Sequence, residues 1–256
     1  MTPRIFVAEA LAAGAALALP ASALRHVQAL RLARGDAVVL FNGSDGAEWP
    51  GELVEIGRGR AVVRVGAPVA VDRELACAVT LAIGMPANDR MDALVEKAGE
   101  LGAAAIQPLV CTRSVLRLAG ERAEARRRHW QAVAVSASEQ CGRARVATVL
   151  PIAPLAAWLR ALEGDANAIR IVLSFDRSAV DPASAWTPAA SDRARATAIV
   201  LSGPEGGLEP NEEDAAVASG FVRVGLGPRV LRADTAPLAW LAWLGVDGLA
   251  RTAARR

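Results

Sequence analysis

Apolar residues in the first 70 positions occur in short runs of β-branched and aliphatic side chains. The clearest runs are 37–41, 52–56 and 60–65. Turn-forming pairs, Asn42-Gly43 and Asp45-Gly46, separate the first run from the second. Short strands at this spacing predict a small β-barrel, and the segment 67–73 is expected to link it to the rest of the chain.

From residue 78 onward, strand-like runs alternate with helical periodicity. Strands are expected at 79–83, 104–110, 169–175, 198–201 and 222–226. Helices are expected from Asn88 to Gly102, over 122–140, and from about 234 to 248. Asn88 is expected to cap the first of these helices and Gly102 to stop it. The alternation predicts an α/β domain with a mainly parallel sheet, while the segment 181–192, rich in Ala, Ser and Pro, is expected to be a surface loop.

A length of 256 residues allows one large domain or two smaller ones, and the 53% hydrophobic content can bury a sizeable core without disulfides. The change of pattern after the segment 67–73 predicts two domains, 1–70 and 75–256. The cysteines are Cys77, Cys111 and Cys141. Their wide spacing fits a reducing cytoplasm and gives no sign of a metal centre. The apolar segment 8–20 lacks a basic start, so we expect no export signal, and no apolar run reaches the roughly 20 residues of a membrane span.

Two loops that begin with Gly-Pro each follow an apolar strand and precede a helix. The first loop, 203–207, reads Gly-Pro-Glu-Gly-Gly and is followed by an acidic helix start at 211–214. The second loop, 227–232, follows the strand 222–226. Glycine lets a ligand approach the main chain, and ligands of open α/β sheets bind at the carboxyl ends of the strands. No Gly-Lys-Ser/Thr follows the first loop, so it is not a nucleotide-binding P-loop.

These two motifs in this order resemble those of the bacterial 16S rRNA uridine-N3 methyltransferases, which belong to the SPOUT superfamily. The resemblance lies in GPEGG and in LGPRVLRADTA, where Ala233-Asp234-Thr235-Ala236 replaces the family's Thr-Glu-Thr-Ala. Further similar segments are 88–92, 97–102, 112–115, 129–130 and 139–143. The resemblance implies an N-terminal PUA-like domain, a trefoil-knotted C-terminal domain that binds S-adenosylmethionine, a homodimer, and 16S rRNA of the small ribosomal subunit as the partner.

The resemblance also implies that the main chain of the two loops reads adenosine while leucines enclose the ring. The expected cofactor-binding residues are Leu201, Gly203, Pro204, Glu205, Gly206, Gly207, Leu226, Gly227, Leu231 and Thr235.

Methyl transfer to uracil N3 requires loss of the N3 proton, which spreads negative charge to O2 and O4. Arg232 is our candidate for the cation that stabilises this charge, and Asp234 and Glu205 are candidates for the proton acceptor. The alternatives are that Arg232 merely neutralises Asp234 at a helix start, and that either carboxylate caps a helix. The chemistry requires no metal.

The formal net charge is only +2, and Lys97 is the single lysine. Guanidinium groups suit phosphate contacts, although the arginine bias also fits a genomic base composition. The candidate RNA-binding residues are Arg25, Arg31, Arg113, Arg126, Arg127 and Arg143. A solvated helix face is the alternative for the arginines of the second helix. Trp240 and Trp243 suggest a dimer interface on the last helix.

Two other functions remain open at this point. One is a SPOUT methyltransferase with another target, such as a ribose 2′-hydroxyl. The other is a non-catalytic RNA-binding factor in ribosome assembly that has kept the fold.

Overall fold

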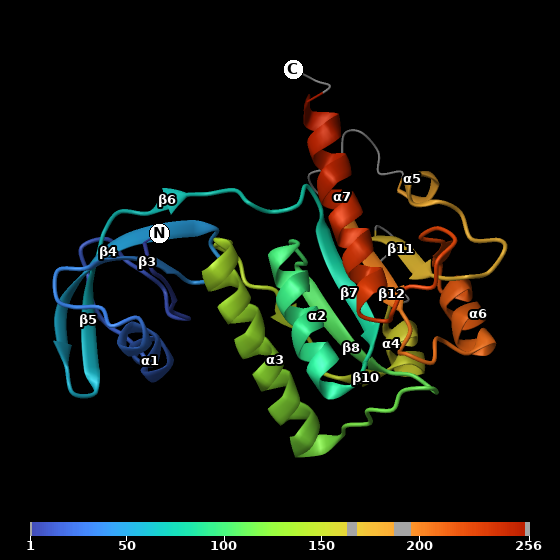
Figure 1. Ribbon diagram of the computed structural model, residues 1–256, viewed down its shortest axis with the longest axis horizontal. Helices are drawn as coiled ribbons and strands as arrows, with labels where there is room; N and C mark the ends of the chain where they lie inside the picture. The colour runs from blue at the N-terminus through green and yellow to red at the C-terminus, as the bar shows by residue number, and fades with distance from the viewer. Residues whose placement is uncertain (1, 163–167, 187–195, 254–256) are drawn as a thin grey trace. The chain divides into compact units, whose positions relative to one another are not determined.

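The computed structural model describes residues 2–162, 168–186 and 196–253. The chain divides into two compact units. Unit 1 contains residues 1–74 and 135–146, and unit 2 contains residues 75–134 and 147–256. Figure 1 shows the elements of both units.

Unit 1 is a small mixed sheet with one helix. Its strands are β1 (Arg4–Phe6), β2 (Ala16–Ala18), β3 (Ala37–Phe41), β4 (Ala47–Gly57), β5 (Arg60–Val65) and β6 (Val69–Ala70), and its helix is α1 (Ala21–Ala29). The strand order is β1-β3-β4-β5-β2, with β6 paired to β4. The core contains Ile5, Leu40, Leu53 and Val63, none of which is exposed to solvent. The expected linker thus includes a strand, β6.

Unit 2 is an α/β domain whose paired strands are all parallel. The strands are β7 (Ala78–Gly84), β8 (Ala105–Val110), β9 (Thr148–Val149), β10 (Ala153–Pro154), β11 (Ala168–Leu173), β12 (Thr197–Ser202) and β13 (Val222–Val224). The helices are α2 (Asn88–Glu100), α3 (Gly120–Cys141), α4 (Leu155–Ala161), α5 (Pro182–Ala185), α6 (Pro210–Ala218) and α7 (Thr235–Ala253). The predicted parallel sheet is confirmed.

The strand order β10-β8-β7-β12-β11-β13 determines where the chain must cross itself. Strand β12 lies between β7 and β11, and β13 pairs with the opposite edge of β11. After β13 the chain returns across this part of the sheet, because α7 packs against α2 and β12 (Figure 1). This is the kind of crossing that the resemblance to a knotted domain leads us to expect. Because β11 pairs in parallel with both β12 and β13, the carboxyl ends of these three strands lie at one edge.

Several element boundaries differ from the sequence predictions. Asn88 lies inside α2, and the N-cap position is Ala87, which makes no side-chain cap. Gly102 ends α2 as predicted, with φ at +95°. The predicted loop 181–192 contains the short helix α5, for which the Asp181 side chain accepts from the Ala183 and Ser184 amides. Its remainder falls largely outside the described residues.

The last part of α3 belongs to unit 1, where polar contacts hold it. The Glu139 carboxylate accepts a hydrogen bond from the Phe6 amide at 3.0 Å and lies 3.2 Å from the His26 ring. Val146 donates its amide to Gly43 at 3.1 Å. The segment 135–146 was assigned to the second domain by the sequence, because a continuous helix gives no local signal of where its contacts change.

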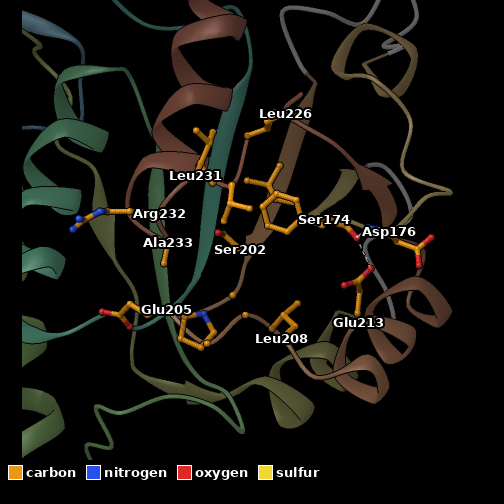
Figure 2. Close-up of a pocket in the computed structure, with 18 of the residues that line it drawn as sticks. Ser174, Asp176, Ser202, Glu205, Leu208, Glu213, Leu226, Leu231, Arg232 and Ala233 are labelled. Carbon is orange, nitrogen blue, oxygen red and sulfur yellow. Dashed lines mark hydrogen bonds between the residues drawn. The ribbon is translucent and has the colours of Figure 1, made fainter. Parts of the chain in front are cut away.

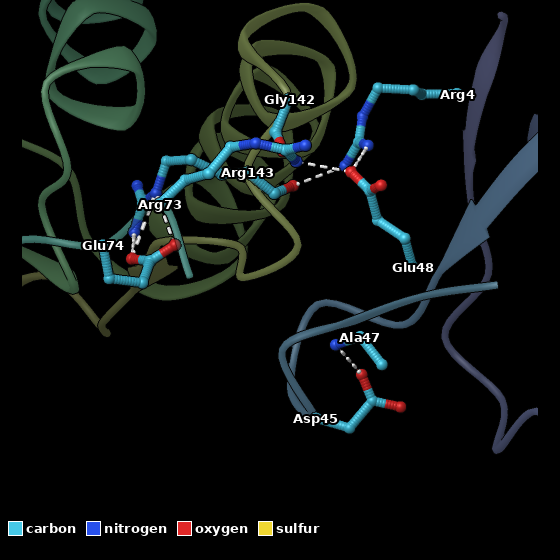
Figure 3. A network of polar contacts seen from close by, with 8 residues as sticks. All are labelled: Arg4, Asp45, Ala47, Glu48, Arg73, Glu74, Gly142 and Arg143. Atoms are coloured by element: carbon cyan, nitrogen blue, oxygen red, sulfur yellow. Dashed lines mark hydrogen bonds and ion pairs between the residues drawn. The ribbon is translucent and has the colours of Figure 1, made fainter. Parts of the chain in front are cut away.

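An arginine network in unit 1 surrounds this segment (Figure 3). Glu48 pairs with both Arg4 and Arg73, and Arg4 also donates to the Arg143 carbonyl at 2.9 Å. Burial raises the pKa of Glu48, but hydrogen bonds from Arg73 and Arg4 outweigh it, so this pKa lies below its usual value. Arg143 pairs with Glu74, and its side chain is only 3% exposed. In this structure Arg143 is therefore a buried residue that supports the fold, which disfavours the predicted RNA contact at this position.

Candidate active site

A pocket of about 820 Å³ lies at the carboxyl ends of three neighbouring strands of unit 2 (Figure 2). This volume falls within the usual range for small-molecule sites, roughly 300–1,000 Å³. Three loops line it. The lining residues are 173–176 at the end of β11, 202–208 at the end of β12, and Leu226 with Arg229 to Ala233 after β13. The pocket thus occupies the position where open parallel sheets bind ligands.

The loop after β12 is a tight turn, and at some of its positions only glycine fits. The Gly207 amide donates to the Pro204 carbonyl at 2.8 Å, and Gly207 has φ at +71°. A Cβ atom on Gly203 would lie 2.7 Å from the Leu208 nitrogen and 2.9 Å from the Gly207 carbonyl carbon. Gly84 at the end of β7 allows Pro204 to approach, because a Cβ there would lie 2.5 Å from the proline ring. The main chain is therefore closely packed beside the pocket.

The acidic start of α6 serves mainly to cap that helix. Glu209 and Glu212 form a capping box, and Glu212 also accepts the Thr112 amide at 2.8 Å. Glu205 does not cap α6. It accepts the amide of Ala87, at the N-cap of α2, at 2.9 Å, and it lies 3.5 Å from Arg90. The sequence alternative that Glu205 supports a helix start is thus observed, but at a different helix.

Arg232 is exposed and lines the pocket. Its main-chain carbonyl accepts the Thr235 and Ala236 amides, both at 3.0 Å, as α7 begins. Within the described residues no ion pair joins Arg232 to Asp234, so the alternative of mutual neutralisation is not observed. Asp234 does not line the pocket, and its buried Oδ1 has no hydrogen-bond partner among the described residues. Figure 2 shows Arg232 and Glu205 extending toward the same side.

A polar group that the sequence analysis missed lies at the opposite side of the pocket (Figure 2). The Ser174 hydroxyl donates to Glu213 at 2.7 Å, and Arg223 donates to the same carboxylate at 2.6 Å. The Glu213 hydrogen bond raises the pKa of Arg223. A hydrogen bond from the Ser178 hydroxyl, at 2.6 Å, lowers the pKa of Asp176. The rule that ligands bind at strand ends, applied to a third strand, would have found Ser174 and Asp176.

Most of the residues predicted to bind the cofactor lie together at the pocket. The pocket is lined by Gly203, Pro204, Glu205, Gly206, Gly207, Leu226 and Leu231. Three others do not line it: Leu201, Gly227 and Thr235. Leu201 is fully buried within β12, where its side chain belongs to the core. Main-chain groups of Gly227 and the first turn of α7 still adjoin the lining residues in sequence.

The predicted RNA-binding arginines are in different environments. Arg113 lines the pocket and donates to the Gly206 carbonyl at 3.0 Å. Arg127 pairs with Glu124 at 2.7 Å and is half-buried, which favours the helix-face alternative for this residue. Arg126 is also half-buried, whereas Arg25 and Arg31 are exposed on unit 1. In the part of the chain that is described, we find no cluster of three metal-ligating side chains and no helix suited to crossing a membrane.

Two family models and a related protein of known activity class match the sequence of this chain. A family model described as an RNA methyltransferase domain matches residues 73–245, and one described as an RNA methyltransferase PUA domain matches residues 19–66. Ribosomal RNA small subunit methyltransferase E of Bacillus subtilis is 30% identical over 214 residues, which are 83% of this chain and 82% of that protein.

Two solved structures are similar over nearly their whole length. Ribosomal RNA small subunit methyltransferase E from Neisseria gonorrhoeae, bound to S-adenosyl methionine, has a TM-score of 0.87 at 34% identity, covering 95% of this chain and 97% of that one. A putative methyltransferase from Legionella pneumophila, also with S-adenosylmethionine, has a TM-score of 0.85 at 27% identity, covering 96% and 98%. With a family model spanning most of the sequence and a fold shared along its length, this chain belongs to the RNA methyltransferase family.

Proposed function

We propose that this protein transfers a methyl group from S-adenosylmethionine to N3 of a uridine in 16S rRNA of the small ribosomal subunit. The observation that carries the proposal is the pocket formed by the carboxyl-end loops of β11, β12 and β13. The glycine loop after β12 packs closely beside this pocket. The whole chain is similar in fold to a relative that was solved with S-adenosyl methionine bound.

The residues of the pocket fit this cofactor. Leu208, Leu226 and Leu231 supply apolar walls for a purine ring, and Gly203, Gly206 and Gly207, which have no side chains, line the pocket with main chain that can lie against the edge of the ring. A Cβ on Gly203 would push against the loop backbone, which supports a role for glycine in shaping this surface. When bound, S-adenosylmethionine supplies a methyl group that is already activated by the positive sulfur. The protein's own residues then need to align donor and acceptor.

The acceptor nitrogen requires two further groups, a proton acceptor and a cation. Glu205 lines the pocket and Asp234 does not, so we assign the proton acceptor to Glu205. Arg232, which extends toward the same side in Figure 2, stabilises the negative charge that develops on uracil O2 and O4. This pairing also places the acceptor base at the side of the pocket where Arg90 lies 3.5 Å from Glu205 and Arg113 donates to the Gly206 carbonyl.

The positive residues at this side favour an RNA acceptor, because phosphate neutralisation dominates nucleic-acid affinity. The N-terminal unit, which matches the PUA family model, supplies Arg25 and Arg31 as further candidate contacts. The homodimer stays a prediction. Trp240 is fully buried within unit 2, with its ring 5.1 Å from the partly exposed Trp243, so only Trp243 of this pair is available to a partner.

Direct cofactor binding separates this function from a non-catalytic assembly factor. We expect the full-length protein to bind S-adenosylmethionine and its demethylated product S-adenosylhomocysteine in a calorimetric titration without RNA. Binding of 16S rRNA with no detectable binding of either cofactor would contradict the proposal and favour the assembly factor.

A further inference from the structure

The two sides of the pocket carry opposite charge. The side with Glu205 also has Arg90, Arg113 and Arg232, so positive groups are in excess there. At the opposite side, Arg223 is surrounded by three carboxylates. These are Asp176, Glu213 and Asp214. Figure 2 separates Glu205 and Arg232 from Ser174, Asp176 and Glu213. An anionic RNA is therefore repelled at the acidic side and attracted at the basic side.

Glu213 is held in one orientation at the acidic side. Its Oε1 atom accepts the Ser174 hydroxyl at 2.7 Å and the Arg223 Nε at 2.6 Å. The side chain is only 20% exposed, and no described residue donates to its Oε2 atom. A carboxylate oxygen has further lone pairs for hydrogen bonds, so Oε2 can accept a donor from a molecule in the pocket. Because Ser174 and Arg223 fix the carboxylate, little side-chain freedom is lost when it binds.

The chemistry of the cofactor indicates which of its groups can donate a hydrogen bond to the Oε2 atom of Glu213. Its methyl group must face the acceptor base, which the charge distribution places near Arg232. Across the view of Figure 2, Leu231 and Leu226 are drawn between Arg232 and Asp176, and both line the pocket as apolar walls that suit the purine ring. The ribose is attached to that ring, carries two hydroxyl donors, and has no charge of its own. A carboxylate is an effective acceptor for such hydroxyl groups.

We propose that Glu213, held by Ser174 and Arg223, hydrogen-bonds the ribose hydroxyls of the cofactor and so orients the cofactor with its methyl group toward Arg232. This inference rests on the proposed function. It assigns a specificity-determining role to a residue outside the two Gly-Pro loops, 203–207 and 227–232. The serine and the arginine are positioning residues for the carboxylate.

A comparison of two ligands in the full-length protein tests this role. The ligands are S-adenosylhomocysteine and its analogue that lacks both ribose hydroxyls, each titrated by calorimetry. We expect the wild-type protein to prefer the diol by about 10–100-fold, the usual effect of hydrogen bonds to a charged group. Glu213→Gln should reduce this preference to about threefold or less, by weakening binding of the diol while leaving the analogue nearly unaffected.

Asp214→Asn is the matched control. Asp214 also pairs with Arg223, at 2.6 Å, but its side chain is 73% exposed. Asp214→Asn, like Glu213→Gln, removes one negative charge that pairs with Arg223. This control variant should still prefer S-adenosylhomocysteine to the analogue that lacks the ribose hydroxyls. Ser174→Ala, which releases one of the two bonds to Oε1, should reduce the preference partly. Melting curves of all variants show whether each is folded.

Three outcomes would overturn the inference. The first is a full diol preference in Glu213→Gln. The second is an equal loss of affinity for both ligands in that variant. This result would mean that Glu213 contacts the amino-acid part of the cofactor or only stabilises the fold. The third is a wild-type protein that binds both ligands equally. A wild-type protein that binds neither ligand would instead contradict the proposed function itself.

Discussion

Gly203→Ala should abolish most of the cofactor affinity while leaving the protein folded. The added Cβ would lie 2.7 Å from the Leu208 nitrogen and 2.9 Å from the Gly207 carbonyl carbon, and both are main-chain atoms that cannot rotate away. The loop must therefore shift, and with it the surface that lines the pocket. We expect the dissociation constant for S-adenosylhomocysteine to rise by at least about tenfold. The methyl-transfer rate should fall by about 10²-fold, the cost of a small misplacement.

Gly225→Ala provides the matched control for this prediction. Gly225 directly follows β13 at the same edge of the sheet, but a Cβ there would meet only ordinary contacts, 3.7 Å from the Ala179 Cβ and 3.9 Å from the Ser174 carbonyl. The control should bind the cofactor within a few-fold of wild type. Wild-type affinity in Gly203→Ala would show that the loop between β12 and α6 does not shape the site.

Arg232→Ala should lower the rate constant of methyl transfer without changing the fold or cofactor affinity. The loss of one preorganised donor to a developing negative charge typically costs about 10²–10³ in rate, roughly 3–4 kcal/mol. Arg232→Lys should recover only part of the rate, because an ammonium group cannot bridge two oxygens as a planar guanidinium does. Single-turnover kinetics at saturating cofactor measure this step directly.

The alternative role for Arg232 has a different signature. If Arg232 served only to neutralise Asp234, then Arg232→Ala and Asp234→Asn would melt at similarly reduced temperatures. No ion pair between them exists in the described structure, so we expect Arg232→Ala to melt near the wild-type temperature. A destabilised Arg232→Ala with a normal single-turnover rate would remove this arginine from the active site.

The parallel sheet and its two glycine loops could be predicted because their signals are local. Long apolar runs such as 198–201 identify buried strands, and Gly-Pro pairs identify the turns that end them. In contrast, β1, β2 and α1 were not predicted. Strands of three residues, such as β1 and β2, carry too little periodicity to be recognised, and α1 shows a helical face over only nine residues.

The hydrogen bonds at the polar side of the pocket could not be predicted, because they join residues that are distant in the sequence. Ser174, Glu213 and Arg223 belong to three separate segments, and only the strand order β12-β11-β13 brings them together. The same holds for Arg143, which looked available in the sequence but is buried against Glu74. An arginine's charge can be read from a sequence, whereas its accessibility depends on tertiary packing.

The most direct test of the central claim is nucleoside mass spectrometry of 16S rRNA after incubation of small ribosomal subunits, prepared without this modification, with the full-length protein and S-adenosylmethionine. We expect a new 3-methyluridine that is absent from the Arg232→Ala reaction within the same time. A 2′-O-methylated nucleoside in its place, or no methylated product from a protein that binds the cofactor and the subunits, would contradict it.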